Sequence, residues 1–235
     1  MSDTGNPRIA AGMRSQLARR RERVAAGDTP LGWKVGFGAP AAMQTLGITA
    51  PLVGYLMRSG LLDSGAEVSF AGWVKPVVEP EIALHIGTDV PAGADRATAQ
   101  AAIAAIGPAF ELADVDLPPQ DAQAILTGNI YQRHVMLGPR DEARAGARLD
   151  GLVGHIVRNG TEVAQTSDLQ QNTGDVIDLV CHVATTLAAF GERLRAGEII
   201  ICGSVVPPLF TEPSDESVAF ELKPLGRVDV RITRE

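Results

Sequence analysis

Apolar and polar residues alternate along several short segments of the chain, a pattern typical of half-buried β-strands. Strands are expected at residues 31–38, 66–70, 80–87, 107–116 and 198–206. Residues 151–167 predict a hairpin, because Asn159-Gly160 joins two β-rich runs and this pair favours a type I′ turn. Residues 217–233 predict a second, C-terminal hairpin.

Apolar residues at helical spacing mark the other elements. Helices are expected at residues 8–26, 40–47, 94–107, 120–126 and 173–194. The third helix is rich in alanine and is expected to continue as far as Gly107-Pro108, where proline ends it. Hairpins with a few interspersed helices indicate an α+β fold with a rolled, mostly antiparallel sheet.

Composition and charge exclude two classes of partner. The 235 residues carry a formal charge of −7, without the basic stripe that a nucleic-acid surface needs. The longest apolar runs fall well short of the ~20 residues that span a bilayer, and the N-terminus has no apolar core of signal-peptide type. Cys181 and Cys202 form no CxxC pair and are expected to be buried, reduced thiols of a cytoplasmic protein.

Two carboxylates interrupt an apolar strand. Glu79 and Glu81 are two residues apart, so their side chains share one face, and Pro80 between them indicates a sheet edge or a bulge. Glu111 occupies an equally apolar strand. Three carboxylates without a His/Cys cluster suit a hard divalent cation, Mg²⁺ or Mn²⁺. The alternative interpretation is a solvated strand face with an unrelated surface residue at 111.

Three further residues are candidates for a site. Lys34 stands between glycines in GWKVGFG, where it would bind a substrate carboxylate or donate a proton if it is not simply a surface lysine. Ser204 ends a buried strand and either lines a pocket or belongs to a turn. His134 follows the polar cluster GNIYQR, which makes it a candidate lining residue.

Three segments, in order along the chain, resemble the fumarylacetoacetate hydrolase superfamily. They are GWKVG at 32–36, PVVEPEIAL at 76–84 and LRAGEIIICGS at 194–204. The most similar group is that of the 2-keto-4-pentenoate hydratases and 4-oxalocrotonate decarboxylases. The resemblance covers most of the chain and implies a small helical N-terminal region, residues 1–66, packed as part of one unit on a mixed, mostly antiparallel β-roll, residues 67–235.

The resemblance also implies the metal site. Glu79, Glu81 and Glu111 match the family's three glutamate ligands for Mg²⁺ or Mn²⁺, and Lys34 matches a lysine beside the substrate. Members of the family are commonly oligomers, so a homo-oligomer is expected.

The activity implied by the resemblance is that of a metal-dependent lyase acting on a small-molecule 2-oxo or 2-hydroxydienoic acid. Hydration through a metal-stabilised enolate is the leading reaction. Lys34 and His134 are the expected catalytic residues, and Lys34, Asn129, Tyr131 and Ser204 are the expected substrate-binding residues.

Departures from the family pattern keep other activities open. Leu52 or Val53 stands where hydratases often carry an aspartate, and Pro207 and Pro208 replace small polar residues. The alternatives are a 4-oxalocrotonate-type decarboxylase, an acylpyruvate C–C hydrolase, and a catalytically impaired subunit that keeps the metal and assembles with another enzyme of the same pathway.

Overall fold

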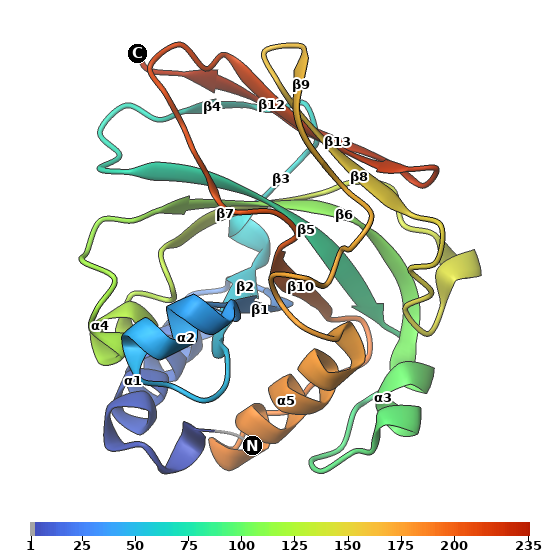
Figure 1. The fold of residues 1–235 in the computed structure, drawn as a ribbon. Coiled ribbons are helices and arrows are strands. Elements are labelled where there is room, and N and C mark those ends of the chain that lie inside the picture. The colour runs from blue at the N-terminus through green and yellow to red at the C-terminus, as the bar shows by residue number, and fades with distance from the viewer. Residues whose placement is uncertain (1–2) are drawn as a thin grey trace.

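The computed structural model describes residues 3–235, which form two β-sheets with the helices gathered at one end (Figure 1). The α-helices are α1 (Pro7–Ala25), α2 (Pro40–Leu46), α3 (Arg96–Ala102), α4 (Ala122–Thr127) and α5 (Val176–Ala189), with 3-10 turns η1 (Asp3–Gly5), η2 (Arg58–Gly60) and η3 (Glu142–Arg144). The strands are β1 (Pro30–Gly36), β2 (Leu52–Met57), β3 (Leu61–Leu62), β4 (Glu67–Ser69), β5 (Pro76–Ile86), β6 (Ile103–Asp114), β7 (Gln132–Leu137), β8 (Val153–Arg158), β9 (Thr161–Thr166), β10 (Ile199–Ser204), β11 (Leu209–Phe210), β12 (Ser217–Lys223) and β13 (Gly226–Thr233).

The larger sheet has eight strands in the order β2-β1-β10-β5-β6-β7-β3, with β11 paired to β5 outside this path. The smaller sheet has the order β4-β13-β12-β8-β9. Pairing is antiparallel except at β1–β10, β3–β7 and β4–β13. The α+β class and the mostly antiparallel roll expected from the sequence are confirmed.

The larger sheet curls so that one of its faces becomes an enclosed interior (Figure 1). Buried residues from six consecutive strands of this sheet, β2, β1, β10, β5, β6 and β7, form one apolar cluster on that face. Ala83 belongs to this inner cluster and lies two residues from Glu81, so the two side chains share the inner face. The opposite face packs into the main hydrophobic core.

The expected helix at 94–107 is wrong in its second half. Helix α3 ends at Ala102, and β6 begins at Ile103, four residues before the expected strand. Ala105 and Ile106 pair with His85 and Leu84 of β5 and are buried. Alanine's helix propensity is a weak preference, which burial within a sheet overrides.

Pro80 does not lie at a sheet edge, because β5 is flanked by β6 on one side and by β10 and β11 on the other. The alternative expectation, a bulge, agrees with the structure. The register between β5 and β10 shifts between Ile201 and Ser204, and the Pro80 carbonyl accepts the Val205 N–H at 2.8 Å. The missing proline N–H therefore falls where the ladder is already interrupted.

Residues 3–66 are not purely helical, because β1, β2 and β3 belong to the larger sheet. Strand β1 is a central strand between β2 and β10, so this region contributes directly to the roll. Helices α1 and α4 pack against each other at the end of the molecule where α2 also lies (Figure 1).

The remaining local expectations have mixed outcomes. The turn at Asn159-Gly160 is confirmed, with φ of 49° and 78° at the two residues. Cys202 is buried and Cys181 only partly so, and both are free thiols. Among the described residues, the helices include none with the length and apolar character needed to cross a membrane.

Candidate metal centre and substrate cavity

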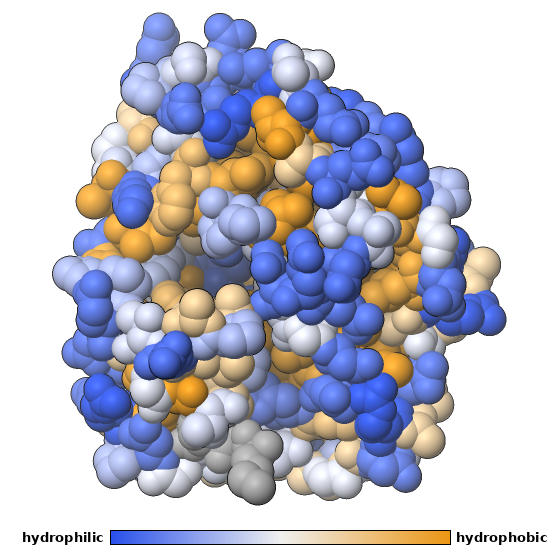
Figure 2. Space-filling model, in the orientation of Figure 1, coloured by the Kyte–Doolittle hydropathy of each residue, from blue (hydrophilic) through white to orange (hydrophobic). Residues whose placement is uncertain are grey.

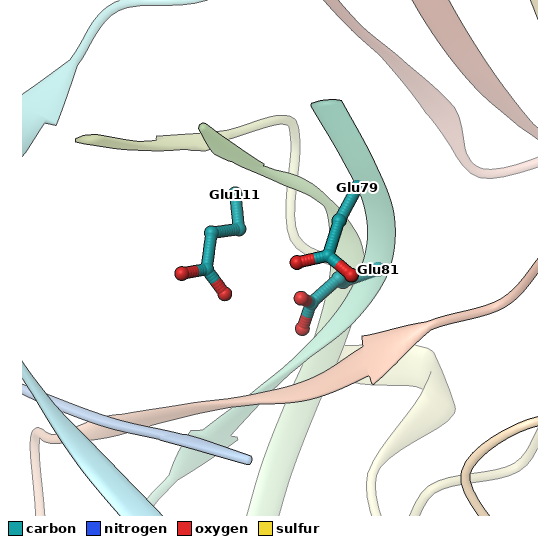
Figure 3. A group of neighbouring side chains, drawn as sticks. All are labelled: Glu79, Glu81 and Glu111. Atoms are coloured by element: carbon teal, nitrogen blue, oxygen red, sulfur yellow. The ribbon is translucent and has the colours of Figure 1, made fainter. Parts of the chain in front are cut away.

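Three glutamates from two neighbouring strands meet on the inner face of the roll. Glu79 of β5 lies directly opposite Glu111 of β6 in the sheet register, and Glu81 follows one step along β5. One carboxylate oxygen from each lies within 4.8 Å of the others, and Figure 3 shows the three side chains pointing toward one another. Like charges directly opposite on a sheet repel, so this arrangement needs a counter-charge.

A glycine at the bulge of β10 holds one of these carboxylates. The Gly203 N–H donates to Glu81 Oε2 at 2.6 Å. Gly203 has a φ of 88°, and a Cβ there would lie 2.9 Å from Thr173 Cγ2. Only glycine adopts this conformation in this space without strain. The bulge therefore orients Glu81 through the backbone.

Lys34 supplies part of the counter-charge. It is 1% exposed, and its Nζ donates to Glu111 Oε1 and to the Ile130 carbonyl, the latter at 2.9 Å. Gly54 on the neighbouring β2 makes room for the lysine stem, because a Cβ there would lie 2.9 Å from Lys34 Cγ. The surface-lysine interpretation of Lys34 is thus excluded.

One lysine does not neutralise three carboxylates, of which Glu81 and Glu111 are buried and Glu79 is half-buried. Burial, helped by the charge of Glu111, raises the pKa of Glu79 to about 7. Burial also raises the pKa of Glu81 well above its usual value and raises that of Glu111 despite the adjacent Lys34. Glu81 Oε1 is buried and has no hydrogen-bond partner among the described residues. A hard divalent cation fits this donor set, because it satisfies the free oxygen and offsets the excess charge.

These pKa shifts predict a pH dependence of metal binding. A cation must displace the protons that the carboxylates hold, so Mg²⁺ affinity should rise steeply up to about pH 7. Without metal, the raised pKa of Glu79 stabilises the fold below about pH 4.5, and this contribution is lost as the pH rises through about 7. Calorimetry at pH 6 in buffers of different ionisation enthalpy should count protons released on Mg²⁺ binding. Mg²⁺ binding without proton release would contradict the raised pKa values of the glutamates.

A cavity of about 490 Å³ adjoins the carboxylate cluster, and Glu79 is the glutamate of the three that lines it. Lys34, Glu79, Tyr131 and Ser204 are among its lining residues, and the face of the molecule drawn in Figure 2 is hollowed near its centre. Ser204 Oγ is buried without a hydrogen-bond partner among the described residues, so its hydroxyl is available to bind a ligand. The pocket alternative for Ser204 therefore agrees with the structure.

Tyr131 faces the cavity from a strained turn. Asn129, Ile130 and Tyr131 all have φ between 53° and 62°, which is uncommon for residues other than glycine. The Tyr131 hydroxyl donates to the Leu117 carbonyl at 3.0 Å, and burial raises its pKa to about 12. The phenol is therefore neutral at physiological pH. The turn also positions the Ile130 carbonyl to accept a hydrogen bond from Lys34 Nζ.

Asn129 has a different position from the one expected. Its side-chain amide accepts from the Tyr55 N–H and donates to the Tyr55 carbonyl, both at 2.9 Å, and it does not belong to the residues that line the cavity. It fastens the strained turn to β2.

Replacing Asn129 by leucine should therefore weaken the fold. Two buried backbone groups of Tyr55 lose their partners, and each costs about 1–3 kcal/mol when left unsatisfied. We expect a loss of about 2–6 kcal/mol in the free energy of unfolding, measured by urea denaturation. A variant as stable as the wild type would contradict the assigned clamp.

His134 lies away from the cavity. It pairs with Leu112 in the register of β6 and β7, so its side chain shares the face of Leu112 and not that of Glu111. Its ring stacks on Trp73 with centroids 6.2 Å apart. The structure does not bring His134 to the glutamates, and its position gives no support to a catalytic role.

The replaced positions in β2 do not line the cavity, although they pair with Val35 and Gly36 of β1, which do. Leu52 and Val53 are buried in the main core and do not belong to the cavity lining. By contrast, Pro207 and Pro208 line the cavity.

Several lining residues were not anticipated from the sequence. Val77 lies two residues before Glu79 on β5, and strand alternation alone indicates that it shares the inner face. Asn172 and Thr173 come from the loop before α5, and Lys75 and Phe210 come from segments whose position no local pattern reveals.

Comparisons with known proteins show the family and agree with the fold. The family model of the fumarylacetoacetate (FAA) hydrolase C-terminal domain matches residues 34–233. A 4-oxalocrotonate decarboxylase of Pseudomonas sp is 27% identical over 230 residues, covering 93% of this chain and 84% of that protein. A 2-hydroxyhexa-2,4-dienoate hydratase of Comamonas testosteroni is 29% identical over 192 residues, covering 80% of this chain and 72% of that protein.

A solved structure shares the fold. The 4-oxalocrotonate decarboxylase from Pseudomonas putida G7, complexed with magnesium and adipate, superposes with a TM-score of 0.87 at 22% identity, covering 99% of this chain and 90% of that one. A curled, mixed sheet with a carboxylate cluster on its inner face defines a β-roll protein with a candidate metal centre. This chain belongs to the fumarylacetoacetate hydrolase family.

Proposed function

We propose that this protein is a divalent-metal-dependent lyase that acts on a 2-oxo or 2-hydroxydienoic acid, with hydration of a 2-keto-4-pentenoate-type substrate as its reaction. The carboxylate cluster carries the proposal. Glu79, Glu81 and Glu111 would hold Mg²⁺ or Mn²⁺, whose hard oxygen preference they match. A bound divalent cation acts as a Lewis acid that polarises the 2-oxo group and stabilises negative charge on its oxygen.

The chain's own groups then orient the substrate and move the proton. The carboxylate and 2-oxo oxygens of the substrate would lie at the cavity floor, where the unpartnered Ser204 hydroxyl is free to donate. Lys34 Nζ offsets carboxylate charge and carries a proton that a reacting carbon can receive. Hydration follows when the dienol becomes the ketone and water adds to the conjugated double bond.

A substrate panel tests the proposal. Purified protein with Mg²⁺ should remove the ultraviolet absorbance of 2-hydroxypenta-2,4-dienoate without release of CO₂. Protein that binds Mg²⁺ and oxalate yet turns over no dienoate would instead be a catalytically impaired partner subunit, and the proposal would fail.

Decarboxylation of a 4-oxalocrotonate-type diacid is the second candidate. The Pseudomonas sp decarboxylase matches a larger share of this chain than the Comamonas testosteroni hydratase does, 93% against 80%. Release of CO₂ from the diacid would identify this reaction. Cleavage of an acylpyruvate would identify the C–C hydrolase alternative. Assembly as a homo-oligomer, or with another enzyme of the same pathway, stays a prediction.

A further inference from the structure

The cavity walls change from polar to apolar one step above the glutamates. On β5, Val77 follows Glu79 on the same face toward the opening, and beyond Glu111 on β6 come Ala113 and then Val115. Residues two apart on a strand are about 7 Å apart. The backbone positions of the apolar wall therefore begin about 7 Å along the strand from those of Glu79 and Glu111.

The cavity wall that follows β10 shows the same change from polar to apolar residues. Val206 lies two residues beyond Ser204 and lines the cavity, and Pro207, Pro208 and Phe210 continue the apolar surface to the mouth. Phe210 is 44% exposed although it is a large aromatic side chain. Orange, apolar surface borders the hollow in Figure 2. A ligand that extends outward from the floor thus meets apolar surface on several sides.

The cavity is larger than a short dienoic acid needs. Its volume of about 490 Å³ lies within the ~300–1,000 Å³ typical of pockets that bury drug-sized ligands. A five-carbon acid held at the glutamates would leave the outer, apolar part unfilled.

We infer that the cavity selects 2-oxo acids with an extended, uncharged apolar tail, which packs along Val77, Val115, Val206 and Phe210 while the acid end stays at the floor. This inference rests on the proposed function for the acid end and adds the nature of the tail. Burial of each methylene against these walls should tighten binding about fourfold.

A ligand with a second carboxylate, at the end of its tail, is expected to bind this cavity more weakly. Lys75 is the cation near the mouth, but it is exposed and its Nζ already lies over the Phe210 ring, 4.2 Å from the centroid. An exposed ammonium contributes little to an ion pair. A carboxylate at the tail would also lose its hydration against the apolar walls without a buried partner.

Calorimetric titration of the Mg²⁺-loaded protein with unbranched 2-oxo acids tests the inference. Affinity should change little from pyruvate to 2-oxobutanoate and then rise about fourfold per methylene through 2-oxooctanoate. The diacid 2-oxoadipate should bind more weakly than 2-oxohexanoate. An affinity independent of chain length, or tighter binding of the diacid, would overturn the inference.

Oxalate separates this inference from the proposed function, because it has no tail. Oxalate binding with a flat chain-length series would overturn only the tail preference, whereas no Mg²⁺-dependent oxalate binding would overturn the proposed function.

A variant at the mouth gives an independent test. Phe210→Ala should lower the ratio of 2-oxooctanoate to pyruvate affinity several-fold, and its exposed position should spare the fold. The matched control is Val163→Ala, at a 50% exposed apolar residue of β9 in the other sheet, which should keep the ratio. An unchanged ratio in Phe210→Ala would contradict the inference.

Discussion

Glu81→Gln should abolish Mg²⁺ binding and reduce turnover by about a thousandfold or more, since an amide cannot replace the charge of a carboxylate ligand and several kcal/mol of charge stabilisation are lost. In the absence of metal, the same substitution should not destabilise the fold. Glu81 is fully buried, and burial raises its pKa well above the usual value, so its charge is unfavourable without a cation. The thermal midpoint without metal should therefore stay the same or rise.

Differential scanning calorimetry with and without Mg²⁺ separates these effects. Wild-type protein should be stabilised by Mg²⁺, by about 2.7 kcal/mol when the ion is at a hundred times its dissociation constant. The variant should show no such shift. Glu142→Gln, at an exposed carboxylate paired with Arg140, is the matched control and should behave as wild type. A Mg²⁺-induced shift of wild-type size in Glu81→Gln would refute the assigned ligand.

Lys34→Met should cost both stability and activity. Lys34 and Glu111 form a pair whose side chains are 2% and 1% exposed, and removal of one partner of a buried pair costs about 3–5 kcal/mol. Loss of the proton carrier should lower turnover by about 10²–10⁴-fold. Mg²⁺ should restore part of the stability, because it supplies a positive charge to the same carboxylates.

Urea denaturation at pH 8, with and without Mg²⁺, measures the first effect, and the dienoate assay measures the second. Lys223→Met, at a lysine whose side chain is 58% exposed, is the matched control and should change neither. If Lys34→Met turned over the dienoate at the wild-type rate, the proposed role of Lys34 in proton transfer would be wrong.

Strand periodicity predicted the common face of Glu79 and Glu81, but not that this face is the inner one. Glu79 and Glu81 lie two apart in an alternating strand, so their common face follows from the sequence, and the structure adds Glu111 directly across the ladder. The same alternation separates His134 from Glu111, but only once the register of β6 and β7 is known. Register depends on long-range pairing, which no local pattern contains.

The failures at the helix boundary and at Asn129 have the same physical origin. Residues 103–107 have helical composition but complete a buried strand of the roll. Asn129 was expected to bind substrate because the resemblance implies an asparagine in the loop after the third glutamate, yet its amide hydrogen-bonds the N–H and the carbonyl of Tyr55. Both outcomes are decided by tertiary partners that are distant in sequence.

A crystal structure with Mg²⁺ and oxalate tests the metal site most directly. We expect one ion bound by Glu79, Glu81 and Glu111, with oxalate on its open side within reach of Lys34 and Ser204. An ion bound elsewhere, or oxalate bound without contact to the ion, would contradict the account.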